Sequence, residues 1–145
     1  MNYDVIPYVG VGPLRFGMTP EDVTRSSGPP LHNDRTRNNE LKQRHPDFTL
    51  VFSDAVGLVE ASFAPEAHLM VGGVDLFRHR APLRHLAALD PSPLESVGIL
   101  YFPKLGITLS GFHKEDSRTV TVMCGGRLDD LLPRFKPYTI LRNVL

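Results

Sequence analysis

Two segments of the chain alternate between apolar and polar residues, and this alternation limits the fold more than any other feature. The first segment reads "HPDFTLVFSDAVGLVEASF", with a polar turn at residues 53–57. A period of two is typical of β-strands that bury one side. The positions on the apolar side are Phe48, Leu50, Phe52, Val59, Ala61 and Phe63. The segment predicts a β-hairpin in an antiparallel sheet with one solvated face.

The second segment, "FPKLGITLSGFHKEDSRTVTVMCGG", repeats this plan later in the chain. Its apolar positions are Leu105, Ile107, Leu109, Val120, Val122 and Cys124. Its other side carries Thr108, Ser110, Thr119, Thr121 and Met123. A second hairpin is therefore expected, and its apolar side belongs to the same core as that of the first.

Short helices are predicted before each hairpin. For a helix at 20–27, Thr19 can cap the first turn, Pro20 suits its first position, and Asp22 stands three residues after the cap. A second helix is predicted at 82–89, where apolar residues recur at helical spacing. Its apolar stripe consists of Leu83, Leu86 and Ala87. We expect both helices to cover the apolar face of the sheet.

The order of elements is the same in both halves of the chain: strand, short helix, polar loop, hairpin. This order indicates two similar βαββ-type units in tandem, at 9–64 and 71–125, followed by a C-terminal tail at 126–145. A chance likeness between two generic units remains the alternative. We expect a single α+β domain, an antiparallel sheet with short helices on one face, in which the polar segment at 32–45 is a surface loop.

Composition excludes several classes of protein. Sixteen basic and sixteen acidic side chains cancel, so no overall field would attract nucleic acid or an anionic membrane. One cysteine excludes an internal disulfide framework, and no run approaches the ~18 apolar residues of a membrane span. The first residues lack a basic n-region and an apolar h-region, so a cytoplasmic location is expected. A chain whose signal had been removed would look the same.

The sequence contains no motif that points to catalysis, a cofactor or a metal. The glycines of "GVGPLRFG" lead into a strand, whereas a phosphate loop opens directly onto a helix. The histidines are His32, His45, His68, His79, His85 and His113, and no two have metal-motif spacing. Cys124 on an apolar strand face is more typical of a small buried hydrophobe than of a nucleophile. Ser53 and Ser110 lie in no GxSxG context.

A family resemblance rests on residues 14 to 30. The pattern "FGMTPEDV" followed by "GPP" resembles the "GMT…V…LG.P" signature of small outer-membrane-assembly lipoproteins of the SmpA/OmlA type. The two-unit layout resembles the tandem architecture of β-lactamase inhibitory protein, in which a helical segment packs on an antiparallel sheet in each unit. The chain departs from the lipoprotein pattern, because it has no lipidated N-terminal cysteine and has Ser27 in place of the usual leucine. The resemblance implies a scaffold that binds proteins.

The sequence therefore favours a non-enzymatic binding module, an immunity or inhibitor protein that neutralises a toxin or effector by occlusion. We expect the partner to contact the polar face of the sheet, with three arginines of "RHRAPLRH" at its rim. These candidate residues are Glu60, Ser62, Thr108, Thr121, Met123, Arg78, Arg80 and Arg84. One alternative is a small enzyme or ligand-binding protein whose site is assembled from loops, using for example His45, His113 or Glu60. Another is an envelope-assembly accessory protein.

Overall fold

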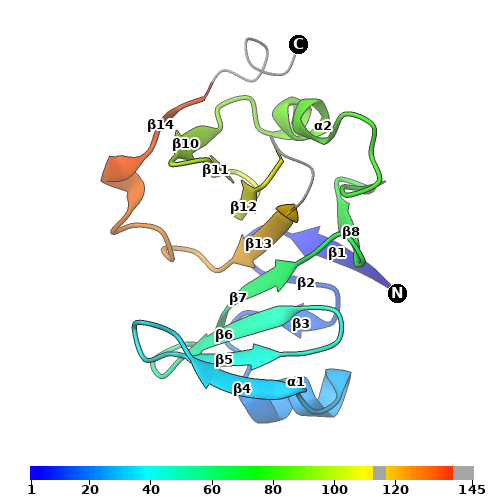
Figure 1. The fold of residues 1–145 in the computed structure, drawn as a ribbon, viewed down its shortest axis with the longest axis vertical. Helices are drawn as coiled ribbons and strands as arrows, with labels where there is room; N and C mark the ends of the chain where they lie inside the picture. Colours follow the sequence, from blue (N-terminus) through cyan, green and yellow to red (C-terminus); the bar gives the residue numbers. More distant parts are fainter. Residues whose placement is uncertain (113–116, 139–145) are drawn as a thin grey trace.

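The computed structural model describes residues 1–112 and 117–138, which form two β-sheets with two short α-helices (Figure 1). The larger sheet has nine strands in the order β14-β10-β11-β12-β13-β7-β6-β5-β4. They span β4 His32–Arg35, β5 Leu41–Arg44, β6 Thr49–Ser53, β7 Gly57–Phe63, β10 Leu94–Ser96, β11 Ile99–Phe102, β12 Ile107–Ser110, β13 Thr119–Met123 and β14 Lys136–Pro137. Every pairing within this sheet is antiparallel, so the predicted α+β class with an antiparallel sheet is confirmed.

Both predicted hairpins form, as β6–β7 and β12–β13. They meet in the middle of the sheet, where β13 pairs with β7 and places Val122 opposite Ala61. Besides Cys124, eleven hydrophobic side chains of the two hairpin segments are predicted to face the core. Each of these eleven is at most 9% exposed. The period of two therefore identified the core-facing positions of these strands, except at the start of β7.

A β-bulge changes one detail of the first hairpin. The register shifts between Val51 and Phe52, so that Leu58 stands opposite Phe52. Leu58 is fully buried and joins the main apolar cluster, whereas Val59 is buried outside it. A bulge adds one residue to one strand only. Simple alternation therefore predicted a core position for Val59, whereas in the structure Leu58 occupies that position.

The first helix, α1 (Pro20–Ser27), has the predicted bounds and cap. The Asp22 amide donates to Thr19 Oγ1, and the Thr19 amide donates to Asp22 Oδ2, both at 3.1 Å. Just before the helix, the chain binds the first hairpin, because the Gly17 amide donates to the Leu58 carbonyl at 3.0 Å and the Leu58 amide donates to the Met18 carbonyl at 2.8 Å. The "FGMTPEDV" segment thus joins α1 to the large sheet.

The second helix, α2 (Pro82–Leu89), also has the predicted bounds, and Leu83 and Leu86 are its buried residues. Its C-terminal end is held by Asp90, which is 1% exposed. The Asp90 carboxylate accepts the Ser92 amide at 3.2 Å and the Lys104 amide at 2.9 Å. This buried carboxylate therefore connects the end of α2 to the turn between β11 and β12.

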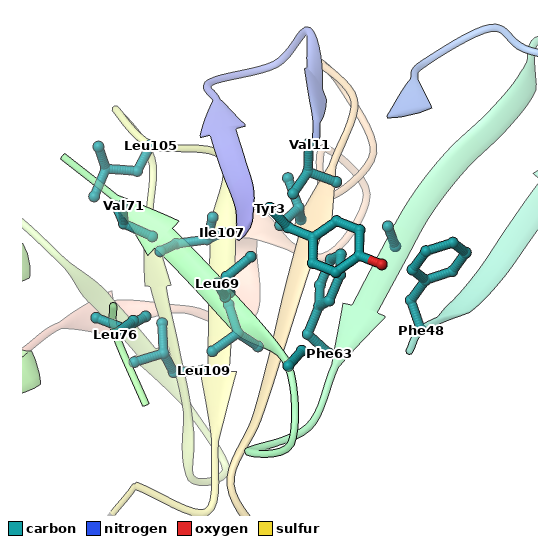
Figure 2. Packing of buried hydrophobic residues seen from close by; sticks show 14 of the residues in the cluster. Tyr3, Val11, Phe48, Phe63, Leu69, Val71, Leu76, Leu105, Ile107 and Leu109 are labelled. Atoms are coloured by element: carbon teal, nitrogen blue, oxygen red, sulfur yellow. The ribbon is translucent and has the colours of Figure 1, made fainter. Parts of the chain in front are cut away.

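A second sheet, which the sequence did not predict, covers the rest of the apolar face. Its order is β3-β2-β1-β8-β9, with β1 at Asn2–Ile6, β2 at Gly10–Val11, β3 at Leu14–Arg15, β8 at His68–Val71 and β9 at Val74–Asp75. Figure 2 shows Tyr3 and Leu69 of this sheet beside Phe63 and Leu109 of the large one. The Tyr3 and Phe63 ring centroids are 5.3 Å apart. The core therefore lies between two sheets and two helices.

The expectation of a surface loop at 32–45 is wrong, because residues 32–44 form the antiparallel hairpin β4–β5. Its turn is closed by the Thr36 amide, which donates to the Glu40 carbonyl at 2.9 Å, and by Asn39 with φ 61°. Strand β4 is exposed along its whole length at the edge of the sheet. An edge strand that is polar on both sides carries no alternation, so its pattern is that of a loop.

The two halves pass through the same kinds of element. Residues 10–63 form a hairpin, helix α1 and the four-stranded meander β4–β7, and residues 68–123 form a hairpin, helix α2 and the meander β10–β13. Each half thus has more strands than the predicted βαββ unit. In the tail, Tyr138 is buried and β14 pairs with β10, whereas residues 139–145 lie outside the described residues.

Candidate functional site

A row of small hydroxyl side chains crosses the large sheet on the face opposite the core. Thr108 of β12 stands opposite Thr121 of β13, Thr121 opposite Ser62 of β7, and Ser62 opposite Thr49 of β6. The Ser62 and Thr121 hydroxyls are hydrogen-bonded at 2.8 Å. All four side chains are only partly buried. This hydroxyl row brings together three of the predicted site residues across the junction of the two halves.

The hydroxyl row continues into a groove of about 460 Å³ above β4–β7. The groove is lined by His32, Asp34, Thr36, Lys42, Arg44, Thr49, Val51, Glu60 and Ser62. Most of its charged residues come from the hairpin that the sequence suggested was a loop. Both signs of charge line it, so it offers hydrogen-bond donors and acceptors rather than a purely apolar surface.

An ion-pair cluster lies beside the groove. The Arg127 guanidinium donates from Nε to Glu60 Oε2 at 2.6 Å, and from Nη1 and Nη2 to the two Glu40 carboxylate oxygens at 2.9 and 2.6 Å. The hydrogen bonds to Arg127 hold the pKa of Glu40 below its usual value, and those to Glu40 raise the pKa of Arg127. Bidentate pairs of this kind have a defined geometry. Glu60 is therefore held in place on the polar face.

Sequence reasoning missed Glu40 and Arg127, and it misjudged Met123. Arg127 lies 67 residues from Glu60 and 87 from Glu40 along the chain, so no local pattern links them. Met123 stands opposite Glu60 on the polar side of β13, yet it is only 3% exposed. Met123 is therefore not exposed to a partner, contrary to the expectation from the sequence, because its side chain is buried although it lies on the polar face.

The structure does not bring the three predicted arginines to the hydroxyl row. Helix α2 packs its buried leucines into the apolar cluster, so Arg80 and Arg84 lie on the core side of the sheet, away from that row. Arg78 holds its own loop together: it donates to the Ala67 carbonyl at 3.0 Å and the Pro65 carbonyl at 2.9 Å, and it pairs with Asp75. These arginines therefore do not form a rim around the polar face.

The residues named for a loop-assembled catalytic site are not grouped. His45 is 3% exposed, its Nε2 lies 3.3 Å from Gln43 Oε1, and burial lowers its pKa. Cys124 is half-buried, and burial raises the pKa of its thiol, which disfavours the thiolate that a nucleophile needs. His113 lies outside the described residues. Within 1–112 and 117–138, no three His, Cys, Asp or Glu side chains are placed to hold a metal ion.

Comparison of the chain with protein-family models, with curated proteins and with solved structures finds no match. No helix in the described part of the chain is long and apolar enough to cross a membrane.

Proposed function

We propose that this protein is a non-enzymatic immunity or inhibitor protein, which neutralises a cognate bacterial toxin or effector by occluding it in the cytoplasm. The docking surface is the polar face of the large sheet, made of the hydroxyl row and the adjoining groove. The observation that carries the proposal is the partly exposed hydroxyl row, which crosses strands from both halves of the chain and adjoins the groove above β4–β7.

The physical properties of this face suit protein binding. Its central residues are short, so they lose little side-chain entropy when a partner covers them. The strands that carry them are fully paired, so the surface is formed before the partner arrives, and preorganisation reduces the cost of binding. The Arg127 ion pairs also hold Glu60 in one position. A nine-stranded sheet is wide enough for a standard interface of ~800 Å² per partner.

We also infer that the halves are tandem copies of one unit, because hairpin, helix and meander follow each other in the same order in both. The two meanders meet at the antiparallel pair β7–β13, and the hydroxyl row crosses this junction. Joining two small sheets edge to edge makes one broad surface from a short chain.

The alternative of a loop-assembled enzyme has less support. A general base must reach a substrate proton. His45 is buried against Phe48, with ring centroids 5.1 Å apart, and Glu60 is already bonded to Arg127. Neither residue is free for proton transfer at an open site. No observation favours the envelope-assembly alternative over protein binding.

The test uses toxins encoded beside the gene for this protein. Each neighbouring reading frame is expressed in a host with and without this protein, and growth is measured. The expected result is that one frame arrests growth and that this protein restores it. Calorimetry on the purified pair should then give a dissociation constant. If no neighbouring frame is toxic, or if none is relieved, the proposal is refuted.

The position of the docking surface is tested with one added charge. Thr108→Arg or Val51→Arg places a cation at the centre of the polar face, where an unpaired charge buried under a partner is costly. We expect at least a hundredfold loss of affinity and no growth rescue, with the midpoint of thermal unfolding nearly unchanged. Thr24→Arg, on the exposed side of α1, is the matched control and should bind normally. Equal affinity for all three variants would place the interface elsewhere.

A further inference from the structure

Three arginines line one small depression on the opposite side of the molecule. Arg80, Arg84 and Arg118 surround a space of about 220 Å³, together with Phe112 and the first turn of α2. Among the described residues, 1–112 and 117–138, no acidic side chain lines this depression, although the whole chain has a formal net charge of zero. The positive charge is therefore concentrated at this point.

The contacts of these arginines differ from those of Arg78, which precedes them by a few residues. Arg78 pairs with Asp75 and with two backbone carbonyls. Among residues 1–112 and 117–138, no carboxylate pairs with Arg80, Arg84 or Arg118. The guanidinium carbon of Arg118 lies 5.2 Å from the centre of the Phe112 ring, and its Nε is buried without a hydrogen-bond partner in the same part of the chain.

The start of α2 adds to this positive charge. Helix α1 supplies its own anionic cap through Asp22, which stands at its third position. Helix α2 has the same length and the same initial proline, but Ala81 replaces the capping threonine and Arg84 stands at the third position. An arginine is unfavourable in the first turn, where the exposed amides and the helix dipole favour negative charge. The arrangement therefore favours an anion from outside.

We propose that this depression binds a phosphate dianion, either free or as the phosphoryl group of a small molecule. Guanidinium groups bind phosphate oxygens in a bidentate manner, so convergent arginines suit this ligand. The space is smaller than the ~300–1,000 Å³ of sites for drug-sized ligands, which favours a compact anion.

The aromatic residues at the site favour a phosphoryl group over a nucleotide base. Arg118 lies over the Phe112 ring, and the Phe77 ring stacks against it with centroids 6.0 Å apart. The Phe112 ring is therefore already engaged, whereas base stacking needs a free aromatic face. This site shares no residue with the hydroxyl row, so the test of phosphate binding does not depend on the proposed toxin partner.

The first test titrates inorganic phosphate into the purified full chain at constant ionic strength, with chloride as the reference anion. Phosphate should raise the midpoint of thermal unfolding and shift the backbone amide signals of Leu83 and Arg84 in NMR spectra. The double variant Arg80→Gln/Arg84→Gln should bind phosphate at least tenfold more weakly. Arg37→Gln, an exposed arginine in the β4–β5 turn, is the matched control and should bind as the unaltered chain does.

No amide shift at α2, or an equal loss of affinity in Arg37→Gln, would overturn the proposal. Phosphoserine distinguishes the two sources of the same group. If phosphoserine binds at least tenfold more tightly than inorganic phosphate, the site is assigned to an organic phosphate. If phosphoserine binds equally or more weakly, the site is assigned to the free anion.

A second variant replaces the external anion with one from the chain. Ala81→Asp places a carboxylate at the N-cap of α2, beside the arginines, so it should raise the unfolding midpoint without phosphate and abolish the further rise with phosphate. Ala88→Asp, at the exposed C-terminal turn of the same helix, should not stabilise the protein and should leave the phosphate response intact. A normal phosphate response in Ala81→Asp would refute the site.

Discussion

The contact between Gly57 and the segment before α1 gives the sharpest test of the fold. Gly57 begins β7 with φ 95°, and a Cβ added there would lie 2.6 Å from the Gly17 carbonyl oxygen and 2.7 Å from that of Met18. Both are backbone atoms, and both belong to the segment that hydrogen-bonds to Leu58. In Gly57→Ala, this segment must therefore move away from the hairpin.

The magnitude follows from two effects. A positive φ costs a residue with a Cβ roughly 1–2 kcal/mol. Displacing the segment also loses its two backbone hydrogen bonds to Leu58, each worth about 0.5–1.5 kcal/mol. Gly57→Ala should therefore lower the free energy of unfolding by about 2–5 kcal/mol. Gly98→Ala is the matched control, because Gly98 also has a positive φ in a hairpin turn but meets nothing within 4 Å. It should lose only the conformational part, about 1–2 kcal/mol.

Urea denaturation followed by circular dichroism measures both losses. Hydrogen exchange adds a local readout, because the Leu58 amide should exchange faster in Gly57→Ala and at the normal rate in Gly98→Ala, after correction for global stability. Equal destabilisation by the two variants would refute the argument, since it would mean that the Gly17–Met18 segment does not depend on a glycine at 57.

Two further predictions concern the core. Phe52→Ala should lower the free energy of unfolding by ~3–5 kcal/mol, because a ring that is 3% exposed leaves a cavity; a loss under about 1 kcal/mol in urea would contradict its placement in packed interior. Burial lowers the pKa of His45 from its ordinary 6.5. Below pH 6.5 the unfolded chain therefore binds more protons than the folded chain, so the free energy of unfolding should fall on acidification, by at most about 1.4 kcal/mol per pH unit. His45→Gln should flatten the profile between pH 7 and 5, and an unchanged slope would mean that His45 does not cause it.

Local signals explain why some elements could be predicted from the sequence. The helix bounds followed from residues next to each other in the chain, such as Thr19 and Pro20 at the start of α1. The buried faces of β6, β7, β12 and β13 followed from alternation, because a strand on a water-exposed sheet must bury every second side chain. These signals need no knowledge of which strands are neighbours.

The candidate site was predicted in part. Alternation with apolar neighbours assigned three residues to the polar face, namely Ser62, Thr108 and Thr121. The groove was not predicted, because the hairpin β4–β5 that lines it has no apolar period. The alternation also placed Met123 on the polar face correctly, but alternation says nothing about what packs on that face.

The sequence by itself determined where the short helices lie and which side of each central strand is buried, because these depend on interactions between residues a few positions apart. Only the tertiary structure decided which strands pair, that a second sheet covers the core, and that Arg127 meets Glu40 and Glu60. It likewise brought Arg118 beside Arg80 and Arg84. Such contacts join residues tens of positions apart, and loop closure and packing select them from many pairings that local propensity leaves equal.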